Sequence, residues 1–287
     1  FTTVNGLSYN RICRLNSDFT IDSSFNIGTG FSRDALKIKV QKDDKILISC
    51  RGDNNYNNES VGELIRINQD GSLDNTFLND KTETNSSISD FDINENGEII
   101  VVGPFSTFNF KIVNGIVLLN SDGSISDEFK SGKGFDYRRV MSFVKFYQGE
   151  IITGGGFTRY NEEMGFLNYN TFKISNSGKL LKNYNFYSAV YNFKVLTENE
   201  FLYMGQFTGL SNNQDDEYLS SKIIILNGDD EVISTLDDEI FNNVYDVIYN
   251  NNEIIAVTAY GDVLSIRYKN KVSVNLPIIS SILESSN

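Results

Sequence analysis

The sequence contains no histidine, no tryptophan, and only two cysteines and two prolines among its 287 residues. Without histidine, the chain lacks the commonest general base and the commonest transition-metal ligand. Cys13 and Cys50 are too few for a disulfide scaffold and lack the close spacing of a metal-binding pair. We therefore expect no metal, no cofactor and no histidine-dependent active site.

Positive charge is also scarce. Lysine and arginine total 25 against 38 acidic residues, which gives a formal net charge of −13 and a pI near 4.5. Such a field opposes any phosphate-rich surface, so nucleic acid is not expected as a partner. No run approaches the roughly 20 apolar residues of a membrane span, so we expect no membrane insertion. A hydrophobic content of 40% predicts a folded core rather than a disordered chain.

A repeat of about 52 residues organises what is present. One segment, residues 11–25, returns as 63–77 and 115–129, with weaker copies at 170–184 and 222–236. A second motif, Asn/Gly-Glu-Ile-Ile and its variants, interleaves with the first. Measured at Lys45, Glu98, Glu150, Glu200 and Glu253, its spacings are 53, 52, 50 and 53.

Each repeat predicts four short strands. Apolar runs such as 99–102 are bounded by turn residues, and the Asp70-Gly71 and Asp122-Gly123 pairs separate two runs in the manner of hairpins. One further strand precedes each Glu motif, as at residues 36–40 and 88–93. Four antiparallel strands every 50-odd residues are typical of a β-propeller blade, an arrangement that protects sheet edges.

The sequence resembles the delta-60 repeat β-propellers, whose blades read "DGKILVGGxF" followed by "RLNxDGSLDxxF". Residues 150–157 and 67–77 carry the match. The resemblance implies an all-β propeller in residues 1–275, followed by an exit segment or tail at 276–287. The resemblance implies no catalytic residues, because this family, whose members include bacterial surface proteins and phage proteins, has no shared catalytic residues. The expected repeats are 1–28 (partial), 35–79, 88–131, 140–186, 189–241 and 244–275.

The first repeat contains outer strands without inner ones. We expect five blades with ring closure by the termini, and six blades as the alternative.

Two sets of links connect the expected strands. The links between first and second strands, and between third and fourth, are short and alike, whereas the others vary in length and are rich in Tyr, Phe and Asn. Loops on a rigid scaffold commonly carry recognition, although loops also tolerate drift in length. The variable links therefore supply the candidate partner-binding residues, which are Tyr56, Phe108, Phe110, Tyr160, Phe166 and Tyr218.

Other patterns have plainer explanations. The stretch from Asp70 to Asp74 lacks the ligand spacing of a calcium loop and is typical of a turn. The glycine run at 154–156 lacks the residues that follow it in a phosphate loop. Carboxylates converging from inner strands would suit a glycosidase, and the candidates for that reaction are Asp34, Asp90, Asp92, Asp136 and Asp246.

We therefore expect a non-catalytic interaction module, a structural or receptor-binding part of a larger surface or phage virion protein, with an extracellular or virion-surface location. Its partner is expected to be a protein or a neighbouring domain, and possible glycan binding makes a glycan-binding adhesin the alternative. A glycosidase-type enzyme ranks third.

Overall fold

The computed structural model describes the strands and most of the turns that join them. The described residues are 1–52, 54–78, 83–136, 139–157, 159–161, 163–164, 170–184, 190–207, 221–229, 231–236, 244–250, 253–258, 263–267 and 272–275. Regular secondary structure within them consists of β-strands. None of these residues belongs to a helix with the length and apolar character needed to cross a membrane.

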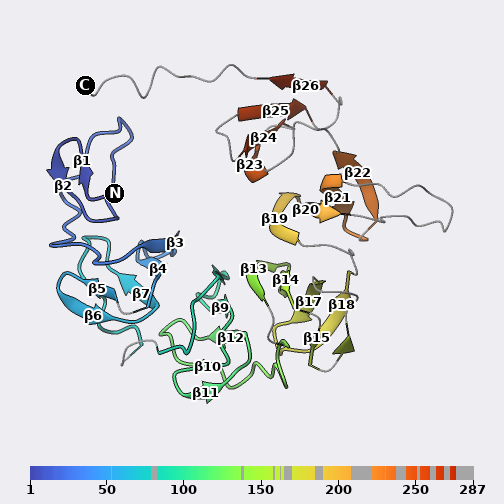
Figure 1. The fold of residues 1–287 in the computed structure, drawn as a ribbon, viewed down its shortest axis with the longest axis horizontal. Helices are drawn as coiled ribbons and strands as arrows, with labels where there is room; N and C mark the ends of the chain where they lie inside the picture. Colours follow the sequence, from blue (N-terminus) through green and yellow to red (C-terminus); the bar gives the residue numbers. More distant parts are fainter. Residues whose placement is uncertain are drawn as a thin grey trace. The chain divides into compact units, whose positions relative to one another are not determined.

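The chain divides into two compact units, residues 1–185 and 186–287. The first unit contains three main sheets, which we call sheets I, II and III, and four small hairpins (Figure 1). Sheet I consists of β3 (Ala35–Val40), β4 (Ile46–Cys50) and β7 (Leu64–Ile67); sheet II of β8 (Asp90–Ile93), β9 (Ile99–Val102) and β12 (Ile116–Leu119); sheet III of β13 (Arg139–Tyr147), β14 (Glu150–Gly156), β17 (Asn170–Ser175) and β18 (Leu180–Asn183).

All three sheets are antiparallel, and their main strands lie side by side in the order in which they occur along the chain. A fourth strand completes sheet III, whereas in sheets I and II its place is taken by single bridges, Ile67–Leu73 and Leu119–Ile125. The second strands are buried throughout in sheets I and II because both faces are covered, which explains their continuous apolar runs.

The second unit contains two four-stranded antiparallel sheets, sheets IV and V, with the same sequential strand order. Sheet IV consists of β19 (Val190–Thr197), β20 (Glu200–Phe207), β21 (Ser221–Asn227) and β22 (Val232–Leu236); sheet V of β23 (Val244–Asn250), β24 (Glu253–Thr258), β25 (Val263–Arg267) and β26 (Val272–Asn275). Apolar side chains of both sheets, such as Leu202, Ile223 and Val247, belong to one core cluster.

The small hairpins in the first unit all have the same type of turn. They pair β1 (Thr3–Val4) with β2 (Leu7–Ser8), β5 (Asn54–Tyr56) with β6 (Glu59–Val61), β10 (Thr107–Phe108) with β11 (Lys111–Ile112), and β15 (Arg159–Tyr160) with β16 (Glu163–Met164). Each has a two-residue loop whose first residue is an asparagine with positive φ, at positions 5, 57, 109 and 161. Asparagine tolerates the left-handed conformation that tight hairpin turns require.

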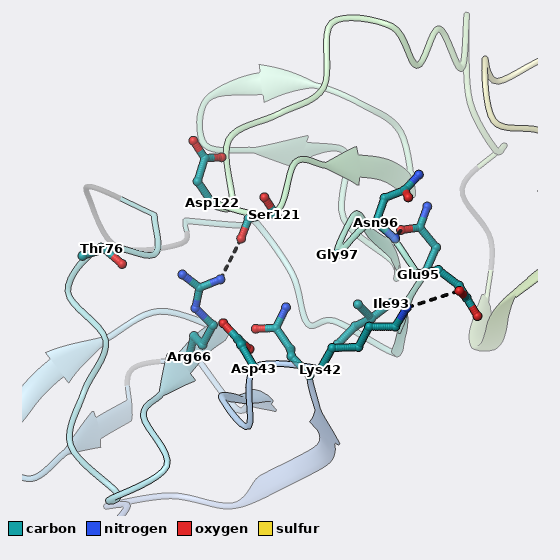
Figure 2. Close-up of a pocket in the computed structure, with 12 residues that line it drawn as sticks. Lys42, Asp43, Arg66, Thr76, Ile93, Glu95, Asn96, Gly97, Ser121 and Asp122 are labelled. Carbon is teal, nitrogen blue, oxygen red and sulfur yellow. Dashed lines mark hydrogen bonds and ion pairs between the residues drawn. The ribbon is translucent and has the colours of Figure 1, made fainter.

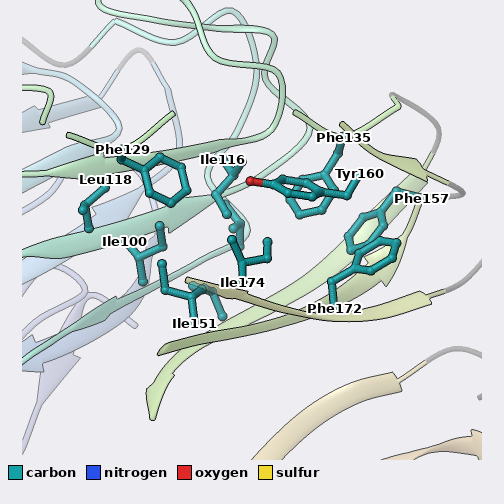
Figure 3. Close-up of a cluster of buried hydrophobic side chains, with 12 residues drawn as sticks. Ile100, Ile116, Leu118, Phe129, Phe135, Ile151, Phe157, Tyr160, Phe172 and Ile174 are labelled. Atoms are coloured by element: carbon teal, nitrogen blue, oxygen red, sulfur yellow. The ribbon is translucent and has the colours of Figure 1, made fainter. Parts of the chain in front are cut away.

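Apolar clusters lie between neighbouring sheets of the first unit. The cluster between sheets II and III combines Ile100 and Leu118 with Ile151 and Phe172 (Figure 3). Similar clusters join sheet I to sheet II and join sheet I to residues 1–31.

A repeated hydrogen bond accompanies each cluster. The backbone N–H groups of Asn26, Leu78 and Lys130 donate to the carbonyl oxygens of Asp70, Asp122 and Ser177, at 2.7 to 2.9 Å. The residue after each acceptor is a glycine, Gly71, Gly123 or Gly178, with φ between 88° and 91°. A Cβ on any of them would lie 2.5 to 2.7 Å from an atom of residue 26, 78 or 130.

Residues 1–31 differ at this position. Their equivalent residue is Phe19, which has a φ of 65° and is 80% exposed. The turns at Gly71, Gly123 and Gly178 pack against the preceding segment. The equivalent turn in residues 1–31 instead carries the exposed Phe19 side chain.

The all-β class expected from the sequence is confirmed, with four-stranded antiparallel sheets in three of the expected repeats.

Candidate functional site

The six aromatic residues expected to contact a partner do not form one surface. Tyr56, Phe108 and Tyr160 are among the most deeply buried side chains of the chain, so the expectation that they offer exposed contact area is wrong. Phe110 is exposed. Phe166 and Tyr218 lie outside the described residues.

The burial of the three aromatics follows from how the hairpins pack. Each of the three hairpins that carry these aromatics bridges to the segment that precedes the main sheet, through the pairs Phe31–Tyr56, Thr84–Phe108 and Phe135–Tyr160. The aromatic side chain then enters the cluster between sheets, as Figure 3 shows for Tyr160 beside Phe135, where the ring centroids are 5.0 Å apart. These links are thus part of the core rather than free loops.

The two tyrosines also make a buried hydrogen bond. The Tyr56 hydroxyl donates to the Gly71 carbonyl, and the Tyr160 hydroxyl donates to the Gly178 carbonyl at 2.6 Å. Burial raises the pKa of both hydroxyls above the ordinary value for tyrosine. They therefore stay protonated and act as structural donors.

The hairpin asparagines hold the turns against the preceding segment. The backbone N–H groups of Asn57 and Asn161 donate to the carbonyls of Gly30 and Gly134, at 3.0 and 2.8 Å. Asn109 bonds to Glu83 twice, donating its N–H and accepting the N–H of Glu83 at its side-chain oxygen. The hairpins are therefore anchored at their tips.

The tip of the β10–β11 hairpin presents an apolar pair to solvent. Phe110 is 84% exposed and Ile112 is 78% exposed, with the exposed Lys111 between them. Phe110 has a φ of 64°, whereas the equivalent residues of two other hairpins are Asn58 and Gly6. A left-handed phenylalanine costs on the order of 1 kcal/mol relative to these residues. The chain therefore holds a large apolar side chain in solvent at a conformational cost.

The inner-strand carboxylates serve as braces between sheets. Asp90 and Asp92 of β8 are buried and pair with Lys37 and Lys39 of β3. Their second oxygens accept the N–H groups of Val144 and Phe146 of β13, at 2.9 and 2.8 Å. Both oxygens of each carboxylate thus have a partner in a neighbouring sheet.

The other three carboxylates proposed for a glycosidase are placed differently. Asp34 is exposed and lies 3.5 Å from Arg11 and 3.7 Å from Arg51. Asp136 accepts the N–H of Arg159 at 2.7 Å. Asp246 belongs to β23 of the second unit, and its side chain lies outside the described part of the chain.

A polar cavity of about 470 Å³ lies between sheets I and II, on the side of the short turns (Figure 2). The Arg66 guanidinium contributes to its wall, donating to the Ser121 carbonyl at 2.7 Å, and the Lys42–Glu95 ion pair spans 3.2 Å nearby. Its lining residues are Gln41, Lys42, Asp43, Arg66, Thr76, Ile93, Asn94, Glu95, Asn96, Gly97, Ser121 and Asp122. None of these lining residues is aromatic.

Asp74 lies behind the cavity wall and fixes Arg66. Burial alone would raise the pKa of Asp74, but hydrogen bonds from Lys45, Thr76 and Arg66 outweigh it and hold the pKa well below its usual range. The Arg66 guanidinium is 2.7 Å from Asp74 and stacks over the Phe77 ring, 4.6 Å from its centroid. The geometry is that of a buried structural ion pair.

Metal-binding groups do not gather in the described part of the chain, where no three Cys, Asp or Glu side chains form a site that could hold an ion. Both cysteines are free, and burial raises the pKa of the Cys50 thiol to about 12. Cys50 is therefore a protonated core residue rather than a nucleophile.

Comparison with known proteins identifies the type of repeat. Residues 1–25, 41–77 and 95–126 match the model of a family described as a domain of unknown function (DUF5122) beta-propeller. No curated protein matches the sequence. The fold, with the family match, defines an all-β domain of the β-propeller type.

Solved structures of similar fold have little sequence identity to this chain. A protein of unknown function from Bacteroides caccae superposes with a TM-score of 0.52 and 14% identity, covering 93% of this chain and 90% of its own. The computationally designed Ika8 protein gives a TM-score of 0.53 at 8% identity, covering 90% and 77%. The extracellular domain of a putative hybrid two component system from B. thetaiotaomicron gives 0.50 at 11%, covering 84% and 29%.

Proposed function

We propose that this chain is a non-catalytic interaction module, a structural or receptor-binding part of a larger assembly on a cell surface or virion. Its repeats resemble those of the delta-60 propellers, which are similar across bacterial surface and phage proteins. The similar domain from B. thetaiotaomicron is extracellular, which is compatible with such a location. The braced positions of Asp90 and Asp92 support a structural role for these carboxylates.

The exposed tip formed by Phe110, Lys111 and Ile112 is the observation that carries this proposal. Aromatic side chains are enriched at the buried centres of protein interfaces, where they offer large area at low entropic cost. The hairpin is anchored at Asn109, so the tip is already ordered before a partner binds. A protein partner with an apolar recess fits this surface better than a glycan does.

Lys111 provides a direct test. Amine-reactive cross-linking of the native assembly, followed by mass spectrometry, is expected to join Lys111 to a second polypeptide. A Lys111 that links only to residues of its own chain contradicts the proposal.

Two variants refine the test. Phe110→Asn and Ile112→Asn should weaken association with the cross-linked partner by about tenfold or more, because both remove contact area from the interface. The stability of both variants should stay near that of the parent. Leu181→Asn, which alters an exposed apolar residue of β18, is the matched control and should leave association unchanged.

A glycan-binding adhesin is the alternative outcome, and a panel of glycans applied to the purified chain distinguishes it. Glycan binding that is unchanged in Phe110→Asn would favour the adhesin over a module that binds a protein partner. Glycoside hydrolysis that is lost in Asp136→Asn would instead support an enzyme.

We also propose that the blades number five, with six as the alternative. Sheets I to V account for five, and the alternative requires a sixth blade that includes residues 1–31. Closure of the ring by the termini stays a prediction.

A further inference from the structure

Asparagines that precede a glycine are points of chemical reactivity in this chain. There are four such pairs, at positions 5, 96, 114 and 227. The first lies in the small β1–β2 hairpin, and the other three lie at turns of the main sheets. A glycine leaves its backbone nitrogen open to close approach, so the side-chain carbonyl of the asparagine before it can be attacked. The attack requires an asparagine side chain that can turn and a following peptide that can move. The fold therefore decides which pair reacts.

Hydrogen bonds hold two of the three pairs in the main sheets. The half-buried Asn114 donates from its side-chain amide to the Lys133 carbonyl at 2.9 Å, and its own carbonyl accepts the Phe135 N–H at 2.8 Å. The Asn227 side chain makes three hydrogen bonds of 2.8 to 3.0 Å within its own turn. These bonds have to open before either side chain can reach the next nitrogen.

The Asn96 side chain is held much less. Asn96 is exposed, and within the described residues no hydrogen bond uses its side-chain amide. Figure 2 shows Asn96 next to Glu95 at the wall of the polar cavity between sheets I and II. The Gly97 N–H donates to the Asn94 carbonyl at 3.1 Å, and this contact in an exposed turn is what has to open. Asn96 is thus the freest of the three.

We propose that Asn96 is a site of spontaneous deamidation. The Gly97 backbone nitrogen gives up its proton to water and forms a bond to the side-chain carbonyl carbon of Asn96. The bond from that carbon to the amide nitrogen then breaks, and the nitrogen takes a proton from water and leaves as ammonia. A cyclic succinimide remains. Water adds to one of its two carbonyls and opens the ring, so water is the only co-reactant and no oxidation takes place.

The two ways of opening the ring give different products. One product is an aspartyl residue, which is the residue type that sheet I already has at the equivalent position, Asp43, 53 residues earlier. The other is an isoaspartyl residue, in which the main chain runs through the former side chain. The extra main-chain atom is incompatible with the bond between Gly97 and Asn94. Either product adds a negative charge to a cavity wall that already contains Glu95 and Asp122.

The test compares the three pairs in one sample. The intact chain is kept in mildly alkaline buffer, and peptide mapping by mass spectrometry follows the conversion of amide to acid at each position. In the folded chain, Asn96 should react at least about tenfold faster than Asn114 and Asn227, because their additional hydrogen bonds keep the reactive conformation rare. In guanidinium chloride that unfolds the chain, the three should react at similar rates, because each precedes a glycine.

Two variants control the measurement. Asn96→Gln retains an amide but lengthens the side chain, which disfavours closure of the ring, and should remove the product at this position without changing the unfolding midpoint. Glu231→Ala removes the carboxylate that accepts the Asn227 side-chain amide, and should speed the reaction at Asn227. A synthetic peptide with Asn96→Asp marks the aspartyl product, so an isoaspartyl peptide is recognised by equal mass and different retention.

Equal rates at the three positions in the folded chain overturn the proposal, as does an Asn96 that reacts only when the chain is unfolded. Faster reaction at Asn114 than at Asn96 overturns it as well, because the order would then be opposite to that of the hydrogen bonds. Conversion of Asn96 ahead of both others, lost on unfolding as a difference in rate, supports it. The site is separate from the Phe110 tip, so none of these outcomes bears on the cross-linking of Lys111.

Discussion

Three turn glycines show how a single residue type sets the spacing between sheets. Gly71, Gly123 and Gly178 combine a left-handed φ with contact to the backbone or side chain of the preceding segment. Any other residue would add both conformational strain and a steric clash. Gly149 has a similar φ of 77° but no atom within 4 Å of its missing Cβ.

This contrast gives a prediction. Gly71→Ala should lower the free energy of unfolding by about 2–3 kcal/mol, since strain adds to a clash with Asn26. Gly149→Ala should cost only about 1 kcal/mol, the conformational part alone. Urea unfolding of both variants measures the difference. Equal losses would show that the inter-sheet contact contributes little.

Asp74 gives a second prediction at the residue scale. Its pKa is depressed in the folded chain, so its ion pairs stabilise the fold above the ordinary value of 3.8 and this stabilisation is lost as pH falls through and below that value. Asp74→Asn should cost about 3 kcal/mol at neutral pH, because Arg66 is left buried without its partner. The difference from the parent should shrink progressively below pH 3.8 in acid unfolding curves. A difference that is constant with pH contradicts the assignment.

At the scale of elements, the small hairpins are packing elements that close the space between sheets. Tyr56 and Tyr160 each reach the carbonyl of the turn glycine, whereas Phe108 stands in the same place without a hydroxyl. The Gly123 carbonyl is the acceptor that Phe108 does not use. The hairpins thus differ by one hydrogen bond.

Tyr160→Phe should therefore destabilise the chain by about 1–2 kcal/mol, because a buried carbonyl loses its donor. Phe108→Tyr should be neutral or stabilising, since it restores the bond that the other two hairpins make. Thermal unfolding of the two variants and of Tyr56→Phe checks this. Destabilisation by Phe108→Tyr comparable to that of Tyr160→Phe would show that the hairpins pack differently.

The strands and the hairpins were not equally predictable from sequence. The apolar runs and Asp-Gly turns placed strands such as β9 and β12, because burial on both faces leaves a pattern in the sequence. The hairpins were missed because their strands are two or three residues long. The signal that would have found them is an asparagine after an aromatic, as in Tyr56-Asn57 and Phe108-Asn109, with the next strand two residues on.

The candidate contact surface was predictable only in part, and the reason is exposure. Phe108 and Phe110 are two residues apart on one hairpin, yet one is buried and the other is in solvent. Sequence alone does not tell which side of a short hairpin faces the core.

At the scale of the whole molecule, charge is the dominant property. A net charge of −13 on 287 residues opposes the compact state by self-repulsion. Raising sodium chloride from low to about 0.5 M should therefore increase the melting temperature, because the Debye length falls below the spacing of most surface charges. Potassium chloride at the same concentrations is the control for effects specific to the sodium ion. A melting temperature that falls with salt would show that ion pairs such as Lys42–Glu95 outweigh the repulsion.

Phe19 has a consequence for how this chain can be rearranged. At the equivalent positions Gly71, Gly123 and Gly178 a neighbouring segment lies against the turn, whereas the Phe19 side chain is exposed. A segment carrying Phe19 in place of Gly71 would put an aromatic side chain where the Asn26 backbone lies. The turns are therefore not interchangeable between repeats, and moving the first repeat to a later place in the chain requires Phe19→Gly.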